Sequence, residues 1–233
     1  MGHHTDESAH VGAWLSRRGF LATAASLGAL FSLGCNKEAG PVTELDPKRL
    51  RDALDGIKKW LSQNNPETAN ALQPGLSTHE IEKLTEQMPI ALTEELFLLY
   101  QWHNGTSKDG PFIWNHHFPP LQTVVRFWSK SLESTWQPSW FPIFLNRGDA
   151  YLVAAFGYKA KMLPIRHFAP QSPNCPNAFA NLTTMMETAL EWYTSGAVKP
   201  NGRGGLRADT DLVRAIFQKH NPEQQYPGDP IEE

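Results

Sequence analysis

The sequence predicts a single α+β domain, and the order of its hydrophobic patterns is the reason. Apolar residues first recur at helical spacing, short apolar runs broken by proline and glycine follow, and helical spacing returns near the end. An order of helices, a block of strands and further helices is typical of an α+β fold. The 18 prolines and 17 glycines argue against a purely helical bundle, and a hydrophobic content of 40% suffices for a packed core.

Three helices are expected before the strands. The first begins at Asp46-Pro47, an N-cap residue followed by proline. The second begins at Ser77, which forms a capping-box pattern with Glu80. The third begins at Thr93 and ends at Asn104-Gly105, which is typical of a left-handed C-cap. Their expected buried faces are Leu50, Leu54, Ile57 and Leu61; then Ile81, Leu84 and Met88; then Leu96, Phe97, Leu99, Tyr100 and Trp102.

The middle of the chain is expected to form a sheet. Residues 144–151 have the spacing of a hairpin whose turn is Arg147-Gly148-Asp149. A short helix is expected between strands at 129–136. The expected strands cover 112–114, 121–127, 140–145, 151–156 and 162–165.

Two helices are expected after the sheet. The first carries a stripe from Phe179 to Tyr193 and ends at Gly196. The second begins at Asp209-Thr210 and ends at 220–222, and a flexible loop at 201–205 separates the two. Residues 223–233 are expected to be a polar tail.

The first 34 residues have the pattern of a twin-arginine export signal. Arg17 and Arg18 are adjacent, Phe20 and Leu21 follow closely, and a moderately apolar run continues to Gly34. The run from Gly19 to Gly34 is 16 residues long, whereas a membrane-spanning helix needs about 20. Export is therefore favoured over the alternative of a permanent membrane anchor.

Cys35 follows the apolar run directly. Ser32-Leu33-Gly34-Cys35 resembles the lipobox of bacterial lipoproteins, in which the cysteine is acylated and becomes the new N-terminus. Small residues at Ser32 and Gly34 also suit ordinary signal cleavage at the same bond, and a disulfide with Cys175 is a third alternative in an oxidising compartment. Lipidation is favoured, so a periplasmic, membrane-anchored protein is expected. The predicted boundaries are a signal at 1–34, a tether at 35–44 and a domain at 45–222.

Four blocks of the chain resemble the SUKH superfamily of Smi/Knr-like domains. They are Pro74-Gly75-Leu76-Ser77 with the helix after it; Leu92-Thr93-Glu94-Glu95-Leu96 through His103-Asn104-Gly105; Trp140-Phe141-Pro142-Ile143-Phe144 with Gly148-Asp149 and Tyr151-Leu152-Val153; and Phe179, Leu190, Trp192 and Tyr193. The resemblance implies one domain with a mainly antiparallel sheet flanked by N- and C-terminal helices. It also implies a non-enzymatic, protein-binding role. Bacterial members resemble immunity proteins that neutralise a toxin, and fungal relatives regulate cell-wall assembly.

Residue chemistry indicates neither a catalytic site nor a cofactor. A net charge of −3 gives no reason to expect nucleic acid as a partner. His103 and the His116-His117 pair suggest a metal site, but adjacent histidines on a strand face opposite ways and no other ligand stands at suitable spacing. Cys175 and His167 could form a nucleophile and base, but a proline-flanked loop offers no helix N-terminus to activate the thiol.

Tryptophans supply the candidate partner-binding residues. Five of them, at 102, 114, 128, 136 and 140, occur within 40 residues. Most are expected in the core, with Trp128 and Trp136 the most exposed, since aromatic residues also anchor interfaces. The candidate set for binding a protein or glycan partner is Trp114, Trp128, Trp136 and Asp149.

Three functions are therefore considered. The first is an exported SUKH-like protein-binding domain, such as an immunity protein against a periplasm-acting toxin. The second is a cell-envelope structural or wall-assembly protein. The third, an exported hydrolase, is least favoured because no catalytic constellation is evident.

Overall fold

A computed structural model of the chain describes residues 45–108, 110–131, 136–146, 149–154, 160–169, 175–202 and 205–226. The predicted export signal (Arg17, Arg18, Phe20 and Leu21), the predicted processing site (Gly34 and Cys35) and the tether lie outside these residues.

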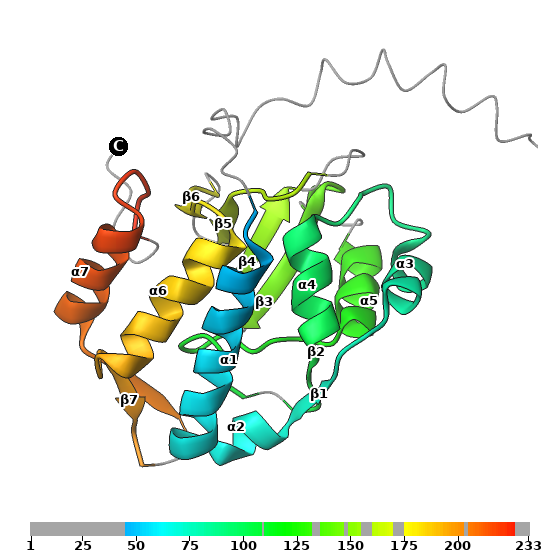
Figure 1. Cartoon of the computed structure of the whole chain (residues 1–233). Helices are drawn as coiled ribbons and strands as arrows, with labels where there is room; N and C mark the ends of the chain where they lie inside the picture. Colours follow the sequence, from blue (N-terminus) through cyan, green and yellow to red (C-terminus); the bar gives the residue numbers. More distant parts are fainter. Residues whose placement is uncertain are drawn as a thin grey trace, which may run out of the picture. The chain divides into compact units, whose positions relative to one another are not determined.

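A four-stranded antiparallel sheet forms the centre of the domain. It consists of β3 (Trp140–Asn146), β4 (Asp149–Ala154), β5 (Ile165–Phe168) and β6 (Asn177–Phe179), in the order β3-β4-β5-β6. Helices α1 (Pro47–Asn64), α4 (Glu94–Trp102) and α6 (Leu182–Thr194) lie in front of the sheet in Figure 1. The predicted α+β fold, a mainly antiparallel sheet flanked by N- and C-terminal helices, is thereby confirmed.

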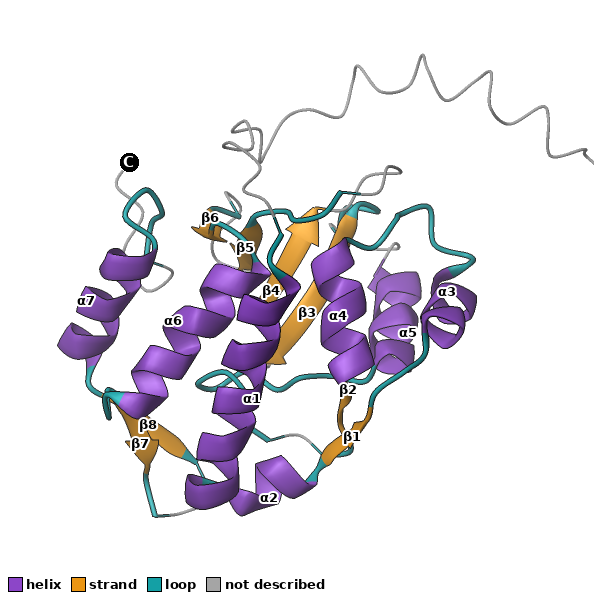
Figure 2. Cartoon of the chain, viewed as in Figure 1, coloured by secondary structure: helices purple, strands orange, loops and turns teal. Residues whose placement is uncertain are grey.

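Shorter elements complete the described part of the chain. Helix α5 (Leu121–Ser131) lies beside β3, and α3 (Thr78–Thr85) packs against α5. Helix α2 (Pro66–Asn70) comes directly after α1. Helix α7 (Thr210–His220) is the last helix of the described residues. Two small antiparallel ribbons lie in the lower part of the view in Figure 2. One pairs β1 (Leu72–Pro74) with β2 (His103–Thr106), and the other pairs β7 (Val198–Pro200) with β8 (Leu206–Ala208).

The predicted helix starts are confirmed by their capping hydrogen bonds. The Asp46 carboxylate accepts from the Lys48 backbone N–H at 2.9 Å, and Ser77 and Glu80 form the full capping box. The Thr93 hydroxyl accepts from the Leu96 N–H at 3.3 Å. Each cap satisfies N–H groups that the first helical turn leaves without a partner. The predicted hairpin is also confirmed, because β3 and β4 pair with Asn146 opposite Asp149.

The prediction of a strand at 121–127 is wrong, because this stretch is the start of α5. The apolar residues Leu121, Val124 and Trp128 are buried at a spacing of three and four, which suits a helix. Pro119-Pro120 precede the helix, and the Leu121 N–H donates to the Asn104 side-chain oxygen at 2.9 Å. Residues 112–114 form a tight turn with an isolated bridge between Ile113 and His116 rather than a strand.

One further prediction needs correction at the C-terminal end, and two short strands there were not predicted. The loop expected at 201–205 lies between these strands, β7 and β8. Residue 223 was expected to begin an unpacked tail, but Tyr226 is buried with its ring 5.2 Å from that of Phe217. Packing of the domain therefore extends beyond the predicted boundary at 222.

A buried carboxylate joins α4 to α6. Glu95 accepts from the Leu182 N–H at 3.2 Å, and from the Thr183 N–H and hydroxyl at 2.7 Å each. Burial raises the pKa of the Glu95 carboxyl, and these hydrogen bonds oppose that rise. The first N–H groups of α6 thus obtain acceptors from another helix, which ties the two helices together.

None of the helices in the described residues is both long and apolar enough to cross a membrane.

Candidate binding sites

Two of the predicted binding tryptophans belong to the core. Trp128 and Trp136 are each only 6% exposed, so the expectation that they are the most exposed is wrong. The Trp128 indole N–H donates to the Pro138 carbonyl at 3.0 Å, and that of Trp136 donates to the Trp140 carbonyl at 3.1 Å. Because these polar groups are satisfied inside the domain, both indoles can be buried without an unpaired donor.

Trp114 is held in an unusual backbone conformation. Its φ is 53°, in the left-handed region that non-glycine residues rarely adopt. Its N–H donates to the Tyr193 hydroxyl at 3.2 Å, and that hydroxyl donates to the Phe112 carbonyl at 2.7 Å. Its ring packs edge-on against Trp192 of α6, with centroids 6.0 Å apart. The turn at Trp114 is therefore fixed to α6 by two hydrogen bonds and an aromatic contact.

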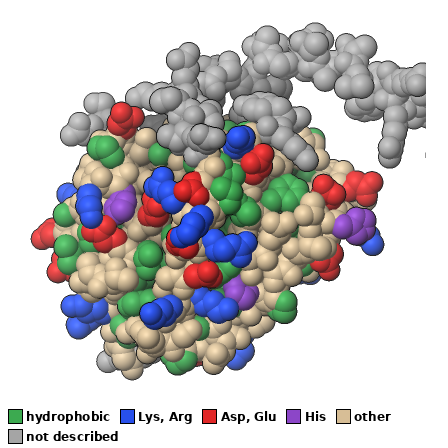
Figure 3. Space-filling view, viewed as in Figure 1, with side chains coloured by type: hydrophobic (Ala, Val, Ile, Leu, Met, Phe, Trp, Pro, Cys, Tyr) green, Lys and Arg blue, Asp and Glu red, His purple; other side chains and the backbone are tan. Residues whose placement is uncertain are grey.

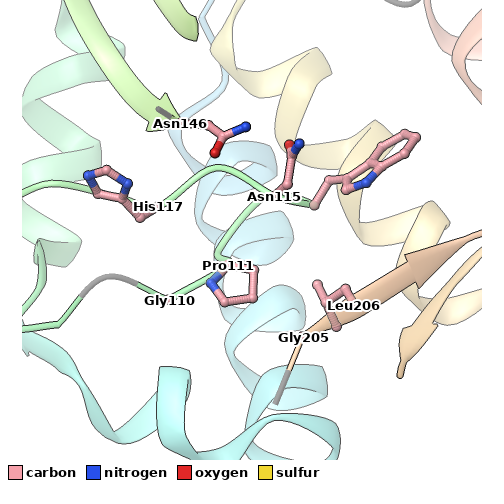
Figure 4. Close-up of a pocket in the computed structure, with 8 residues that line it drawn as sticks. Gly110, Pro111, Asn115, His117, Asn146, Gly205 and Leu206 are labelled. Atoms are coloured by element: carbon pink, nitrogen blue, oxygen red, sulfur yellow. The ribbon is translucent and has the colours of Figure 1, made fainter. Parts of the chain in front are cut away.

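A cavity of about 590 Å³ lies beside this turn, and we refer to it as the Trp114 cavity. Figure 4 shows the side chains of Asn115 and Asn146 at one end of it and those of Pro111 and Leu206 at the other. Asp149, the fourth predicted residue, is half-buried at the start of β4, and it is not among the described residues that line the cavity. The lining residues are Gly110, Pro111, Trp114, Asn115, His117, Asn146, Gly205 and Leu206.

A second concave surface, the α3–α5 groove, has a volume of about 480 Å³. Its apolar residues are Leu76, Leu84, Met88, Val125 and Trp128. Its polar residues are Glu80, Lys83, Glu86, Gln87, Gln122 and Ser129, all of them exposed. The sequence predicted Leu84 as a buried residue of its helix, whereas the structure leaves it half-exposed in the groove.

Both walls of the groove are anchored to the end of α4 and to β2. The Leu76 N–H, just before α3, donates to the Tyr100 carbonyl at 2.9 Å. A Cβ at Gly75 would overlap the Gln101 carbonyl oxygen, so this close approach requires glycine. Gly105 has a φ of +68°, and a Cβ there would meet the backbone of Pro119 and Pro120 just before α5. These contacts hold the two walls of the groove in place.

His116 is buried in an environment that favours its neutral form. It is 5% exposed, and neither ring nitrogen has a hydrogen-bond partner among the described residues. Its ring lies 4.5 Å from that of Tyr151 and 6.4 Å from that of His167. Burial lowers the pKa of His116 to about 3, and His167, whose own pKa is also lowered by burial, adds to the effect on His116.

The other groups considered for chemistry occupy separate places. His103 caps α4, and its ring contacts the Gln73 carbonyl at 2.6 Å and the Lys58 ammonium at 3.1 Å. Burial lowers the pKa of His103. Cys175 is only 2% exposed. Within the described ranges, no three His, Cys, Asp or Glu side chains are arranged to hold a metal ion.

Charged side chains of both signs are interspersed on the face that carries α1 and α6 (Figure 3). Ion pairs such as Arg49 with Glu187, at 2.7 Å, and Lys219 with Glu191, at 2.8 Å, connect neighbouring helices there. Nucleic-acid binding normally requires a continuous basic surface, which this face does not present.

No family model matches this chain, and no curated protein matches it. Candidate functions therefore rest on the geometry of the two concave surfaces. Of the four predicted residues, Trp114 lines the Trp114 cavity and Trp128 forms part of the floor of the α3–α5 groove. Asn115 and Asn146 also line the Trp114 cavity but were not among the predicted residues, because asparagine next to a turn or at a strand end is usually structural.

Proposed function

We propose that this chain is an exported, non-enzymatic, SUKH-like domain that binds a protein through the α3–α5 groove. The proposed partner is a toxin that acts in the periplasm, and the chain serves as its immunity protein, anchored to the membrane through a lipidated Cys35. The resemblance in four sequence blocks supports the domain family, and the Arg17-Arg18 pattern supports the location.

The observation that carries this proposal is the composition of the groove. The groove has apolar side chains on its floor, and exposed charged and amide side chains surround them. Protein interfaces have the same arrangement of an apolar centre and a polar rim. Leu76, Leu84 and Val125 are half-exposed and supply apolar surface that a partner can contact. A partner helix or loop with two or three apolar side chains on one face fits such a surface.

The groove is also preorganised for binding a folded partner. The capping box fixes the start of α3, and a hydrogen bond of 2.9 Å joins the Gln101 amide to the Thr78 hydroxyl. Because α3 and α5 are already in place, binding would not have to order them. Preorganised surfaces lose less conformational entropy on association.

The test introduces a charge into the floor of the groove. Val125→Arg is compared with Gln218→Arg, which adds the same charge to an exposed position on α7. Proteins captured by the wild-type full chain from a cell-envelope extract are identified by mass spectrometry, and the dissociation constant of the captured partner is then measured for each variant. We expect Val125→Arg to weaken binding at least about tenfold, as removal of one interface contact does, and Gln218→Arg to leave it unchanged.

Two results would contradict the proposal. Equal binding by Val125→Arg and wild type, with both variants folded by circular dichroism, would exclude the groove as the binding surface. If no captured protein binds Val125→Arg more weakly than Gln218→Arg, the groove does not have the proposed protein-binding function.

A further inference from the structure

We propose that the Trp114 cavity binds a neutral oligosaccharide, at a site separate from the α3–α5 groove. The first reason is the character of its wall. The described lining residues combine amide and imidazole groups with apolar side chains, a combination that suits an uncharged polar ligand. A volume of about 590 Å³ lies within the roughly 300–1,000 Å³ typical of small-molecule sites.

The polar groups of the cavity match the hydroxyl groups of a sugar. Asn115 and Asn146 each offer an amide that can donate and accept hydrogen bonds, and His117 adds an imidazole. Adjacent sugar hydroxyls likewise donate and accept, so an amide can satisfy two of them together. Figure 4 places the two amides at one end of the cavity and Pro111 and Leu206 at the other.

This separation suits the two-sided character of a sugar ring, which carries polar hydroxyls at its edge and C–H groups on its faces. The hydroxyls would lie toward Asn115 and Asn146, and the C–H groups toward Pro111 and Leu206. Trp114 is half-buried and also lines the cavity, so it can offer the sugar ring an aromatic contact.

The segment that carries these groups is held rigidly. The Phe112 N–H donates to the His116 carbonyl at 2.8 Å, and the His116 N–H donates to the Ile113 carbonyl at 2.9 Å. Trp114 keeps a left-handed φ of 53°, a strained conformation that persists only where surrounding contacts impose it. Such a preformed site loses little entropy when it binds a flexible chain of sugars.

An uncharged peptide is the main competitor, and the backbone at the cavity argues against it. Peptides usually bind at such places by adding a strand to a sheet edge. Here the His117 N–H donates to the Leu145 carbonyl at 2.9 Å, and the Leu145 N–H donates to the His117 carbonyl at 3.1 Å. The edge of β3 is therefore already paired at this point, which leaves recognition to the side-chain amides.

The test measures binding of defined probes to the purified full chain by isothermal titration calorimetry. The neutral probes are chitotetraose, an N-acetylated glycan of the kind found in cell walls, together with cellotetraose and maltotetraose, a storage-type glucan. Tetragalacturonate serves as a charged probe, and a tetrapeptide with blocked ends serves as an uncharged peptide. Comparison of the three neutral probes distinguishes a wall glycan from a storage glycan as the source.

We expect saturable binding of at least one neutral oligosaccharide. Asn115→Ala, at an exposed position that should not disturb folding, is expected to weaken it about tenfold, the effect of losing one or two hydrogen bonds. Asn146→Ala is expected to do the same, whereas Gln87→Ala in the α3–α5 groove should leave it within about twofold of wild type.

Three outcomes would overturn the proposal: no saturable binding of any neutral probe, tighter binding of tetragalacturonate or the peptide, or undiminished sugar binding by both asparagine variants. None of these outcomes bears on the α3–α5 groove, so this proposal and the proposed protein-binding function fail independently.

Discussion

Replacement of His116 by phenylalanine is expected to make the protein more resistant to acid. In the folded chain His116 is buried, neither of its ring nitrogens has a partner among the described residues, and its pKa is about 3. In the unfolded chain a histidine has a pKa of about 6.5. As the pH falls from about 6.5 toward 3, His116 therefore binds a proton in the unfolded state but stays neutral in the folded state.

The size of the effect follows from this difference. Because the folded-state pKa is lowered, the stability that depends on neutral His116 is fully present above pH 6.5 and decreases below it. Because the unfolded state binds one proton more than the folded state in this range, the free energy of unfolding falls by about 1.4 kcal/mol per pH unit. At pH 5 it is therefore about 2 kcal/mol lower than at neutral pH. His116→Phe removes this loss and keeps an aromatic ring beside Tyr151. It also eliminates two ring nitrogens that have no hydrogen-bond partner among the described residues.

The assay is urea unfolding at pH 7 and pH 5, followed by tryptophan fluorescence. The stability gained by His116→Phe over wild type should be about 2 kcal/mol larger at pH 5 than at pH 7. His79→Gln, which removes an exposed histidine from α3, is the control and should follow the wild-type pH dependence. If wild type and His116→Phe lose the same stability between pH 7 and pH 5, His116 accepts its proton without cost and the reasoning from its burial is refuted.

Other consequences can be tested with equally small changes. Arg17→Lys combined with Arg18→Lys should abolish export, since both arginines define the predicted signal, and normal periplasmic accumulation in cell fractions would contradict it. Cys35→Ser should move the protein from the membrane fraction to the soluble fraction if Cys35 carries the lipid, whereas an unchanged distribution would exclude that anchor. Gly75→Ala should destabilise the fold by about 2–3 kcal/mol in urea unfolding, because its Cβ would overlap a backbone carbonyl of α4. Gly202→Ala, where only the positive φ opposes a side chain, should cost about 1 kcal/mol, and an equal loss at both positions would argue against the close approach at Gly75.

Local signals in the sequence predicted the helix starts correctly. A cap such as Asp46, Ser77 or Thr93 depends on backbone groups no more than three residues away, so the necessary information is contiguous. Helix α5 shows the opposite situation. The adjacent Val124 and Val125 suit either a strand or a helix, and the helix begins where the Asn104 side chain accepts from Leu121, a contact across 17 residues of sequence.

The tryptophans show why residue type alone could not identify the binding surfaces. Trp128 and Trp136 have the size and polarity of interface residues, but nearby backbone carbonyls accept from their indole nitrogens and the rings are buried. Trp114, by contrast, is only half-buried, and the asparagines that share its cavity come from the same turn and from the end of β3. No pattern of spacing connects Asn115 to Asn146.

The sequence by itself determined the fold class, the starts of the capped helices, the β3–β4 hairpin and most of the core positions on α1, because these depend on periodicity and on neighbours within a turn. Only the tertiary structure decided that α5 is a helix and where the two concave surfaces lie. The α3–α5 groove exists because Gly75 and Gly105 allow two distant segments to approach the end of α4 and β2. The Trp114 cavity likewise brings together a turn, the end of β3 and the start of β8. Its lining residues extend from Gly110 to Leu206, 96 positions later in the sequence, so its chemistry arises from packing.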